Sequence, residues 1–409
     1  MIKKLLVSAI LLLIFPILGQ SKTVLAPYQY LKTSGARDIT PFTLGGAQYL
    51  AIPQLSKDES DTPANINGGK AKVDVLIFRW VNGKLHLYQK ILGHGNEGTA
   101  FFRIKDQAYL ATSSIYSKPK TANNKHSYTK LYRWDGHYFY PIQQFFTFAS
   151  KGVYAFSIGE RHFLAFANGV VLPDNNITIN TDSIVYEWNG KKFIPFQSFP
   201  TKWAYGWDFF TINGSRYLAL TDHAKASRIY RWNGRKFVLF QSFSKTGGRA
   251  FSHFTIDGKF YLAYANLLHP SVIYQWAGNQ FVEYQPLKGL GGRNFVYFFD
   301  HGNHYLFRIN FITGPRTKPK AKLSSQLYQW INGKFQVIQN ITTLGGVDAA
   351  VFSVNNQRYL GVANSLNEQA RFQTDSVIYK INNPDYPSKK VSSKAISAKN
   401  NQIILLRFD

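Results

Sequence analysis

One hairpin unit recurs along the chain and constrains the fold more than any other feature. In residues 183–197, SIVYEWNGKKFIPFQ, Tyr186 and Trp188 occupy alternate positions, which is the period-two pattern of a β-strand. The Asn189-Gly190 pair then predicts a type I′ turn, in which both central residues have positive φ. A second strand follows from Phe193. Related units, 44 or 54 residues apart, are marked by the tryptophans Trp80, Trp134, Trp188, Trp232, Trp276 and Trp330.

A second strand pair precedes each hairpin. It opens on an aromatic-leucine pair at Tyr49, Tyr109, Phe163, Tyr217, Tyr261, Tyr305 and Tyr359. Seven residues earlier lies a phenylalanine of a preceding strand, and in the sixth unit we assign this position to Phe299, which implies a turn one residue shorter. Each unit therefore reads as four antiparallel strands, A to D. A repeat of about 50 residues with four strands is typical of a β-propeller blade.

The number of strands predicts how the ring closes. There are seven A–B–C units but only six complete C–D hairpins, because no D strand follows residues 377–380. Residues 25–29, LAPYQ, match FIPFQ at 193–197, so Gln29 joins the series Gln89, Gln143, Gln197, Gln241, Gln285 and Gln339. We expect an all-β, seven-bladed propeller in which the N-terminal strand completes the last blade and removes an exposed sheet edge.

The two ends of the chain differ from the repeats. Lys3 and Lys4 followed by an apolar run to Leu18 are typical of a secretory signal, and the run is too short to span a bilayer. We therefore expect a signal peptide over 1–21, a propeller over 22–383, and a linker with a short tail strand over 384–409. The chain contains no cysteine, so an exported protein of this kind would have no disulfides. We expect a secreted, periplasmic or extracellular monomer without a transmembrane segment after signal removal.

The YLA-type strand followed by S-x-IY-x-WNG-x-x-F-x-x-FQ resembles the EPTP, or epilepsy-associated (EAR), repeat. That repeat forms the propeller domain of the leucine-rich glioma-inactivated proteins. The resemblance extends over residues 23–380, although this chain lacks the leucine-rich repeats and cysteines of those animal proteins. It implies a secreted protein-interaction scaffold without catalytic activity, and it does not identify the partner.

Residues that recur in every blade are interpreted as structural, and residues that interrupt the repeat as candidates for binding. The recurring aromatic side chains should fill the space between blades, and the glutamines should satisfy backbone groups. The loops that connect B to C and D to A vary most, and they should lie on one face of the propeller. We expect a protein partner to bind there, with basic contributors from blades two and six, namely Lys118, Lys120, Lys125, Lys130, Arg316, Lys318, Lys320 and Lys322.

The formal net charge of +26 leaves a second binding function open. A lectin-like protein, or one that binds an anionic polymer such as a cell-surface glycan, would use the positive charge and the abundant aromatic residues. No specific nucleic-acid motif accompanies the charge. A generally basic exported protein is the simpler interpretation of the same composition.

Enzymatic activity is not predicted. Acidic residues are scarce, no convincing carboxylate pair recurs, and the ten histidines form no HxxxH or HExxH pattern. We therefore expect neither catalytic residues nor a cofactor. Asp38 and Asp348 occupy equivalent positions near the start of the inner strands of blades one and seven. They suggest a cation bound in the channel, with a turn or a salt bridge to Arg37 as the structural alternative.

Overall fold

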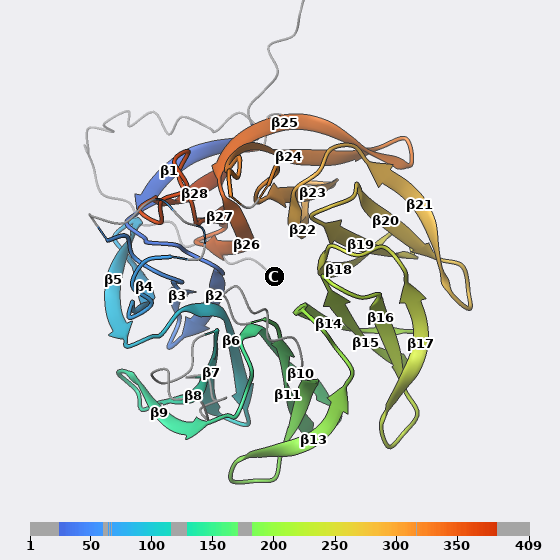
Figure 1. The fold of residues 1–409 in the computed structure, drawn as a ribbon, viewed down its shortest axis with the longest axis horizontal. Coiled ribbons are helices and arrows are strands. Elements are labelled where there is room, and N and C mark those ends of the chain that lie inside the picture. The colour runs from blue at the N-terminus through green and yellow to red at the C-terminus, as the bar shows by residue number, and fades with distance from the viewer. Residues whose placement is uncertain are drawn as a thin grey trace, which may run out of the picture.

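The computed structural model describes residues 24–59, 64, 66, 68–115, 129–170, 182–315 and 317–382. These residues form seven four-stranded antiparallel sheets arranged around a central axis, as Figure 1 shows. The predicted seven-bladed all-β propeller is confirmed, and no helix forms within the described part of the chain. Consequently no described helix is long and apolar enough to cross a membrane. The predicted signal peptide and C-terminal tail lie outside the described residues.

Each blade uses four strands from the axis outward. The A strands are β2 (Thr40–Leu44), β6 (Asn96–Ile104), β10 (Ser150–Ile158), β14 (Ala204–Ile212), β18 (Gly248–Ile256), β22 (Gly292–Asp300) and β26 (Gly346–Val354). The B strands are β3 (Ala47–Ile52), β7 (Gln107–Ser114), β11 (Arg161–Asn168), β15 (Ser215–Asp222), β19 (Lys259–Asn266), β23 (Asn303–Asn310) and β27 (Gln357–Asn364). The C strands are β4 (Val75–Val81), β8 (Lys130–Trp134), β12 (Ser183–Trp188), β16 (Ser227–Trp232), β20 (Ser271–Trp276), β24 (Lys322–Ile331) and β28 (Ser376–Ile381). The D strands are β5 (Lys84–Ile91), β9 (Phe139–Gln144), β13 (Phe193–Phe199), β17 (Phe237–Phe243), β21 (Phe281–Leu287), β25 (Lys334–Leu344) and, for blade seven, β1 (Leu25–Leu31).

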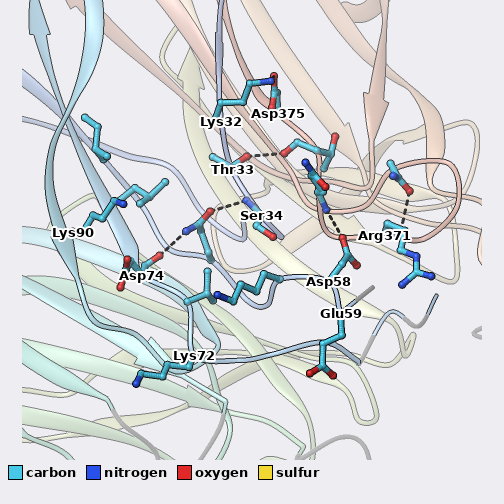
Figure 2. A pocket seen from close by; sticks show the side chains of 18 residues that line it. Lys32, Thr33, Ser34, Asp58, Glu59, Lys72, Asp74, Lys90, Arg371 and Asp375 are labelled. Carbon is cyan, nitrogen blue, oxygen red and sulfur yellow. Dashed lines mark hydrogen bonds and ion pairs between the residues drawn. The ribbon is translucent and has the colours of Figure 1, made fainter. Parts of the chain in front are cut away.

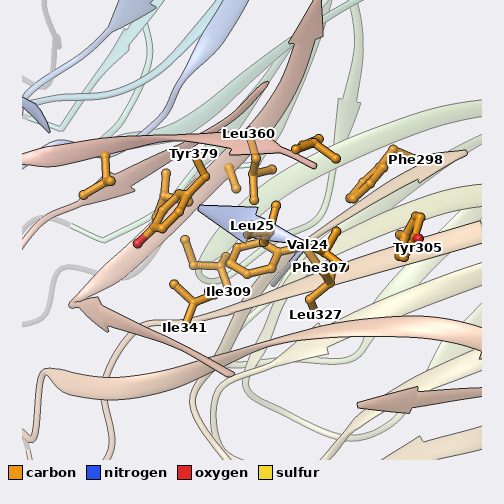
Figure 3. Packing of buried hydrophobic residues seen from close by; sticks show 14 residues of the cluster. Val24, Leu25, Phe298, Tyr305, Phe307, Ile309, Leu327, Ile341, Leu360 and Tyr379 are labelled. Carbon is orange, nitrogen blue, oxygen red and sulfur yellow. The ribbon is translucent and has the colours of Figure 1, made fainter. Parts of the chain in front are cut away.

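The ends of the propeller are joined as predicted. Strand β1 pairs antiparallel with β28, from Leu25 opposite Ile381 to Leu31 opposite Ser376. In Figure 1, the blue β1 lies against the red strands of blade seven. Figure 3 shows that Val24 and Leu25 enter the apolar core shared by blades six and seven, beside Phe307, Ile309 and Tyr379. The N-terminal strand therefore contributes core packing as well as backbone hydrogen bonds.

The recurring glutamines join neighbouring blades. Each pairs, through its side-chain amide, with a backbone N–H and C=O near the start of the next D strand. Gln241, for example, donates to the Phe281 carbonyl at 2.8 Å and accepts from the Phe281 N–H at 2.8 Å. The other pairs are Gln29 with Leu85, Gln89 with Phe139, Gln143 with Phe193, Gln197 with Phe237, Gln285 with Phe335 and Gln339 with Leu25. The structural interpretation of these residues is confirmed.

The recurring aromatic residues fill the spaces between blades, also as expected. Trp80 of blade one lies 4.8 Å from the ring centre of Tyr359 and 6.0 Å from that of Tyr28, both in blade seven. In blade six, Phe298 pairs with Tyr305 across the A–B hairpin, so the assignment of Phe299 was wrong. Phe298 lies seven residues before Tyr305, and the turn therefore has the same length as in the other blades.

The hairpin turn that defined the repeat differs from the sequence prediction. Of Asn189 and Gly190 only the glycine has positive φ, at 96°. Asn189 instead begins a four-residue loop, and its side-chain oxygen accepts hydrogen bonds from the N–H groups of Lys191 and Lys192 at 3.1 and 2.9 Å. This side-chain closure makes a second left-handed residue unnecessary. The type I′ pattern occurs where the loop has two residues, as at Asn82-Gly83, with φ of 48° and 83°.

Candidate functional site: a charged ring in the central channel

The axis of the propeller opens through a funnel on the face formed by the B–C and D–A loops, here called the loop face. A cavity of about 230 Å³ occupies the funnel. Its upper wall is largely apolar and includes Trp203 and Leu290 from D–A loops and Leu268, Phe311 and Ile312 from B–C loops. Apolar side chains of these loops thus converge next to the start of the inner strands.

Six side chains form the floor of the funnel and are called the channel ring. Each lies five positions before the phenylalanine of its A strand, at or just before the first residues of that strand. The ring consists of Arg37, Glu97, Lys151, Tyr205, Arg249 and Arg293, all of which also line a second cavity of about 410 Å³ further along the channel. Val347 occupies the seventh equivalent position.

Glu97 is the one carboxylate of the ring, and cations surround it. Its Oε1 lies 3.3 Å from the Lys151 ammonium and 3.7 Å from the Arg37 guanidinium, and all three side chains are buried. Burial raises the pKa of Glu97, but the charges of Arg37, Lys151 and Arg293 lower it by more, to about 2. Glu97 is therefore ionised at neutral pH and compensates only part of the positive charge of the ring.

Two arginines lie against Tyr205. The guanidinium carbon of Arg249 lies 3.8 Å from the centre of the Tyr205 ring, and that of Arg293 lies 4.8 Å from it. Enclosure raises the pKa of Tyr205, but the charges of Arg249, Lys151 and Arg293 lower it by more, so the net shift is downward. Burial lowers the pKa of Arg249 to about 10, and it remains charged at neutral pH. The tyrosine hydroxyl is consequently a stronger hydrogen-bond donor than in water.

Below the ring, Asp38 and Asp348 face each other across the seam between blades one and seven. Both accept a hydrogen bond from the Ile39 N–H, at 2.8 and 3.1 Å, and Asp348 also accepts one from the Asn294 side chain. Burial and the nearby Asp38 raise the pKa of Asp348 well above its ordinary value of 3.8. Asp348 therefore keeps its proton to a higher pH than an exposed carboxyl group does.

The alternative of a salt bridge from this pair to Arg37 is not what the structure shows, because Arg37 pairs with Glu97. A channel cation at Asp38 and Asp348 stays a prediction. Within the described ranges no group of three or more histidine or acidic side chains could hold a metal ion. A cation here would need backbone or hydroxyl oxygens, such as that of Thr99, as further ligands.

On the opposite side of the channel, Asp208 of blade four holds His253 of blade five. Its two carboxylate oxygens lie 2.9 and 3.0 Å from Nδ1 of His253, and one also accepts the His253 N–H at 3.0 Å. Burial lowers the pKa of His253, but the carboxylate of Asp208 raises it by more. This contact links two neighbouring A strands.

A wide groove on the loop face follows the seam between blades one and seven, as Figure 2 shows. Asp58, from the acidic segment of the blade-one loop, accepts the backbone N–H groups of Phe372 and Gln373 at 3.1 and 2.9 Å. Gln54 bridges the Ser34 N–H and the Asp74 carbonyl at 2.6 and 2.7 Å. These polar side chains are engaged in holding the loops of the two closing blades together.

The structure describes half of the predicted basic contributors. Lys318 and Lys320 are exposed in the blade-six B–C loop, next to the Thr313–Gly314 part of the funnel rim. Lys322 forms an ion pair of 2.7 Å with Glu368 of the blade-seven loop. Lys130 begins strand β8 and is half-buried. Lys118, Lys120, Lys125 and Arg316 lie outside the described residues, so the predicted basic cluster stays a prediction.

The channel ring was missed in the sequence prediction, although a signal for it exists. The inner strands repeat strongly at the phenylalanine, whereas the position five residues before it carries Arg, Glu, Lys, Tyr, Arg, Arg and Val in blade order. When the seven blades are aligned on that phenylalanine, this position is seen to differ from blade to blade. The residue type at this position does not follow the repeat, as is expected of functional positions in a repeat protein.

Comparison with known proteins identifies the family to which the repeats are similar. A model described as EPTP domain matches residues 25–81, 139–189, 192–233, 236–277 and 334–382, which together make up more than half of the chain. The human thrombospondin-type laminin G domain and EAR repeat-containing protein is 32% identical over 181 residues, which are 43% of this chain and 25% of that protein. Its mouse counterpart is 29% identical over 155 residues, 37% of this chain and 22% of that protein.

This chain thus spans about a quarter of the length of these two relatives. Among solved structures, a mutant Aleuria aurantia lectin in complex with alpha-methyl-L-fucoside matches with 12% identity and a TM-score of 0.44. The match covers 76% of this chain and 97% of the lectin chain. The same lectin in complex with Fucalpha1-6GlcNAc has 12% identity and a TM-score of 0.45.

Proposed function

Because the chain belongs to the EPTP-domain family, we propose that it is an exported, non-catalytic propeller scaffold that binds a protein partner through its loop face. One observation carries the choice of face. The loop face combines an apolar funnel with a charged floor and with blade-to-blade variation, which are the features of a specific interface. The opposite face, called the turn face, consists of short A–B and C–D turns that repeat from blade to blade.

We propose that the protein is not an enzyme, because of its family and because the carboxylates of the channel already interact with neighbouring side chains. Glu97 is held ionised by the neighbouring cations, and Asp208 is bonded to His253. Asp38 and Asp348 accept a hydrogen bond from the same Ile39 N–H group. None of these arrangements places an acid and a base on the two sides of a substrate, as a hydrolase of sugars requires. Export is proposed from the charged and apolar pattern of residues 1–21.

Charge reversal on the two faces tests the proposal. The loop-face variant is Lys318→Glu with Lys320→Glu, and the matched turn-face variant is Lys191→Glu with Lys192→Glu. All four lysines are exposed, so each variant changes the charge equally and should shift the free energy of unfolding by about 0.5 kcal/mol or less. Wild-type and variant proteins are used to capture extracellular and cell-surface proteins. A partner retained by wild type and the turn-face variant, and lost with the loop-face variant, supports the proposal. Loss with the turn-face variant alone contradicts it.

A second candidate function is binding of an anionic polymer through the turn face. Lys84, Lys191, Lys192, Arg235, Lys236 and Lys334 are all exposed there. Affinity for a sulfated glycan such as heparin should then fall steeply as salt concentration rises and should weaken in the turn-face variant. Binding to a protein partner through the apolar funnel should depend much less on salt.

A further inference from the structure

Arg249 is a buried arginine whose donors are not all used. Its side chain is 5% exposed, and neither Nε nor Nη1 has a hydrogen-bond partner among the described residues. Arg308 offers a contrast within the same protein. It is also buried, and its Nε likewise has no hydrogen-bond partner among the described residues, but its Nη1 and Nη2 both donate, to the carbonyls of Lys288 and Gly289 at 2.7 and 2.8 Å. Arg308 therefore supports the fold, whereas the surroundings of Arg249 leave its charge only partly satisfied.

The channel ring itself contains four cationic side chains and one carboxylate, while Asp38, Asp208 and Asp348 line the channel beside it. Arg37, Lys151, Arg249 and Arg293 are each at least nine-tenths buried, and Glu97 is the one carboxylate among them. Buried charges without partners destabilise a folded protein. Burying positively charged side chains that lack hydrogen-bond partners lowers stability, so a protein that keeps them is expected to need them for a function. Here an anion that enters from the funnel would accept hydrogen bonds from the unused donors of Arg249.

The walls of the funnel restrict what that anion can be. Trp203, Leu268, Leu290 and Phe311 line the space above the ring, and the cavity of about 230 Å³ corresponds to the volume of roughly eight water molecules. An apolar wall favours a ligand with an apolar body and disfavours a strongly hydrated dianion such as phosphate. A carboxylate bears one negative charge on two oxygens, which suits neighbouring guanidinium groups.

We propose that the channel ring binds the carboxylate of a small organic acid, with Arg249 and Arg293 holding the carboxylate and the funnel wall holding an apolar body. Tyr205 lies between these arginines and can donate its hydroxyl hydrogen to the bound oxygen. The acid can be a free metabolite or the carboxyl terminus of a peptide, since both present the same group. This site is the floor of the funnel in the proposed loop-face surface, but its binding of an acid does not require a protein partner.

The experiment uses 4-phenylbutyrate and its uncharged amide as probes of the intact protein. Isothermal titration calorimetry and the fluorescence of the funnel tryptophan should report binding of the acid and not of the amide. Arg249→Met should weaken binding roughly tenfold or more, because a charge-assisted contact is lost. Arg249→Lys, which keeps the charge, should retain part of the affinity. A peptide ending in an apolar residue, tested with a free and an amidated C-terminus, separates the peptide source from the free acid.

Thermal stability separates a binding role from a structural one. Without ligand, Arg249→Met should melt at the same temperature as wild type or higher, since it removes a poorly satisfied buried charge. Arg308→Met should melt lower, because it removes the two hydrogen bonds that this buried side chain donates to the carbonyls of Lys288 and Gly289. Three results would overturn the proposal: no binding of the acid to wild type, equal binding to Arg249→Met, or unfolding of Arg249→Met comparable to that of Arg308→Met. Inorganic phosphate binding as tightly as phenylbutyrate would also overturn the role of the apolar body.

The Lys318→Glu, Lys320→Glu variant should bind the acid normally. Failure of the acid-binding proposal is therefore distinguishable from failure of the loop-face proposal.

Discussion

Gln339 and Leu25 are 314 residues apart in sequence and are joined by paired hydrogen bonds. The Gln339 side chain donates to the Leu25 carbonyl and accepts from the Leu25 N–H, each at 2.8 Å. The same kind of contact links each of the remaining pairs of neighbouring blades. Only the Gln339–Leu25 contact joins the two ends of the folded chain. Together with the pairing of β1 and β28, it closes a ring that has no disulfide.

Deleting residues 23–32 should prevent stable folding. The deletion removes the outer strand of blade seven and leaves the backbone of β28 and the apolar core shared with blade six exposed. Thermal unfolding followed by circular dichroism measures the effect, and a chain truncated after residue 383 serves as the control because it keeps every strand that the structure describes. Equal melting temperatures for the deletion and the full chain would show that the closure is not needed.

Replacing one of the recurring glutamines should destabilise the propeller measurably. Gln241→Ala removes two hydrogen bonds and leaves the N–H and C=O of Phe281 without this partner, which should cost about 1–3 kcal/mol in the free energy of unfolding. Gln336→Ala is the control, since Gln336 is exposed and should change stability by about 0.5 kcal/mol or less. Denaturant unfolding gives both values. If the two substitutions cost the same, the contact between blades contributes nothing.

Glu97 should make stability depend on pH in the acid range. Its pKa falls from an ordinary 4.5 to about 2 on folding, so its contribution is present above pH 4.5 and is lost as pH falls towards 2. The shift corresponds to a contribution on the order of 3 kcal/mol at neutral pH. Glu97→Gln should therefore be less stable than wild type at pH 7, and the difference should shrink between pH 5 and 3. A difference that is constant over this range would contradict the assignment.

Asp348 should have the opposite effect. Because its pKa is raised in the folded state, the stability it contributes is present below its ordinary pKa of 3.8 and is lost as pH rises through the folded pKa. Asp348→Asn should remove this dependence and should be at least as stable as wild type at neutral pH in the absence of divalent cations. Melting curves recorded in EDTA and over a pH series check this. A variant that keeps the wild-type pH dependence would show that another group is responsible.

The same variant tests the predicted channel cation. If Asp38 and Asp348 bind Ca²⁺, millimolar CaCl₂ should raise the melting temperature of wild type relative to EDTA, because a ligand of the folded state stabilises it. Asp348→Asn should not respond. An equal response of both proteins, or none in wild type, would rule out this cation site.

Much of the fold could be predicted from the sequence because it depends on local patterns that repeat. Alternating residues indicate the strands, and the shared LAPYQ and FIPFQ segments identify the N-terminal strand as the missing member of blade seven. The seven glutamines recur because each blade presents the same backbone groups to its neighbour. Local patterns were less informative for the turn at Asn189. The loop there has four residues, two more than a type I′ turn, and hydrogen bonds to the Asn189 side chain replace the expected backbone conformation.

The central site was decided by the tertiary structure. The consecutive ring residues Arg37, Glu97, Lys151, Tyr205 and Arg249 are each separated by 44 to 60 residues along the chain and meet only because seven sheets close around one axis. Likewise, the Lys322–Glu368 ion pair and the contact of Asp58 with Phe372 join loops whose relative positions no strand pattern specifies. The blades and the order in which they close could be predicted from the sequence, since these follow from repeated short-range pairing. Which side chains meet at the axis, and which charges remain uncompensated there, depended on long-range closure, because that geometry sets the distances between blades.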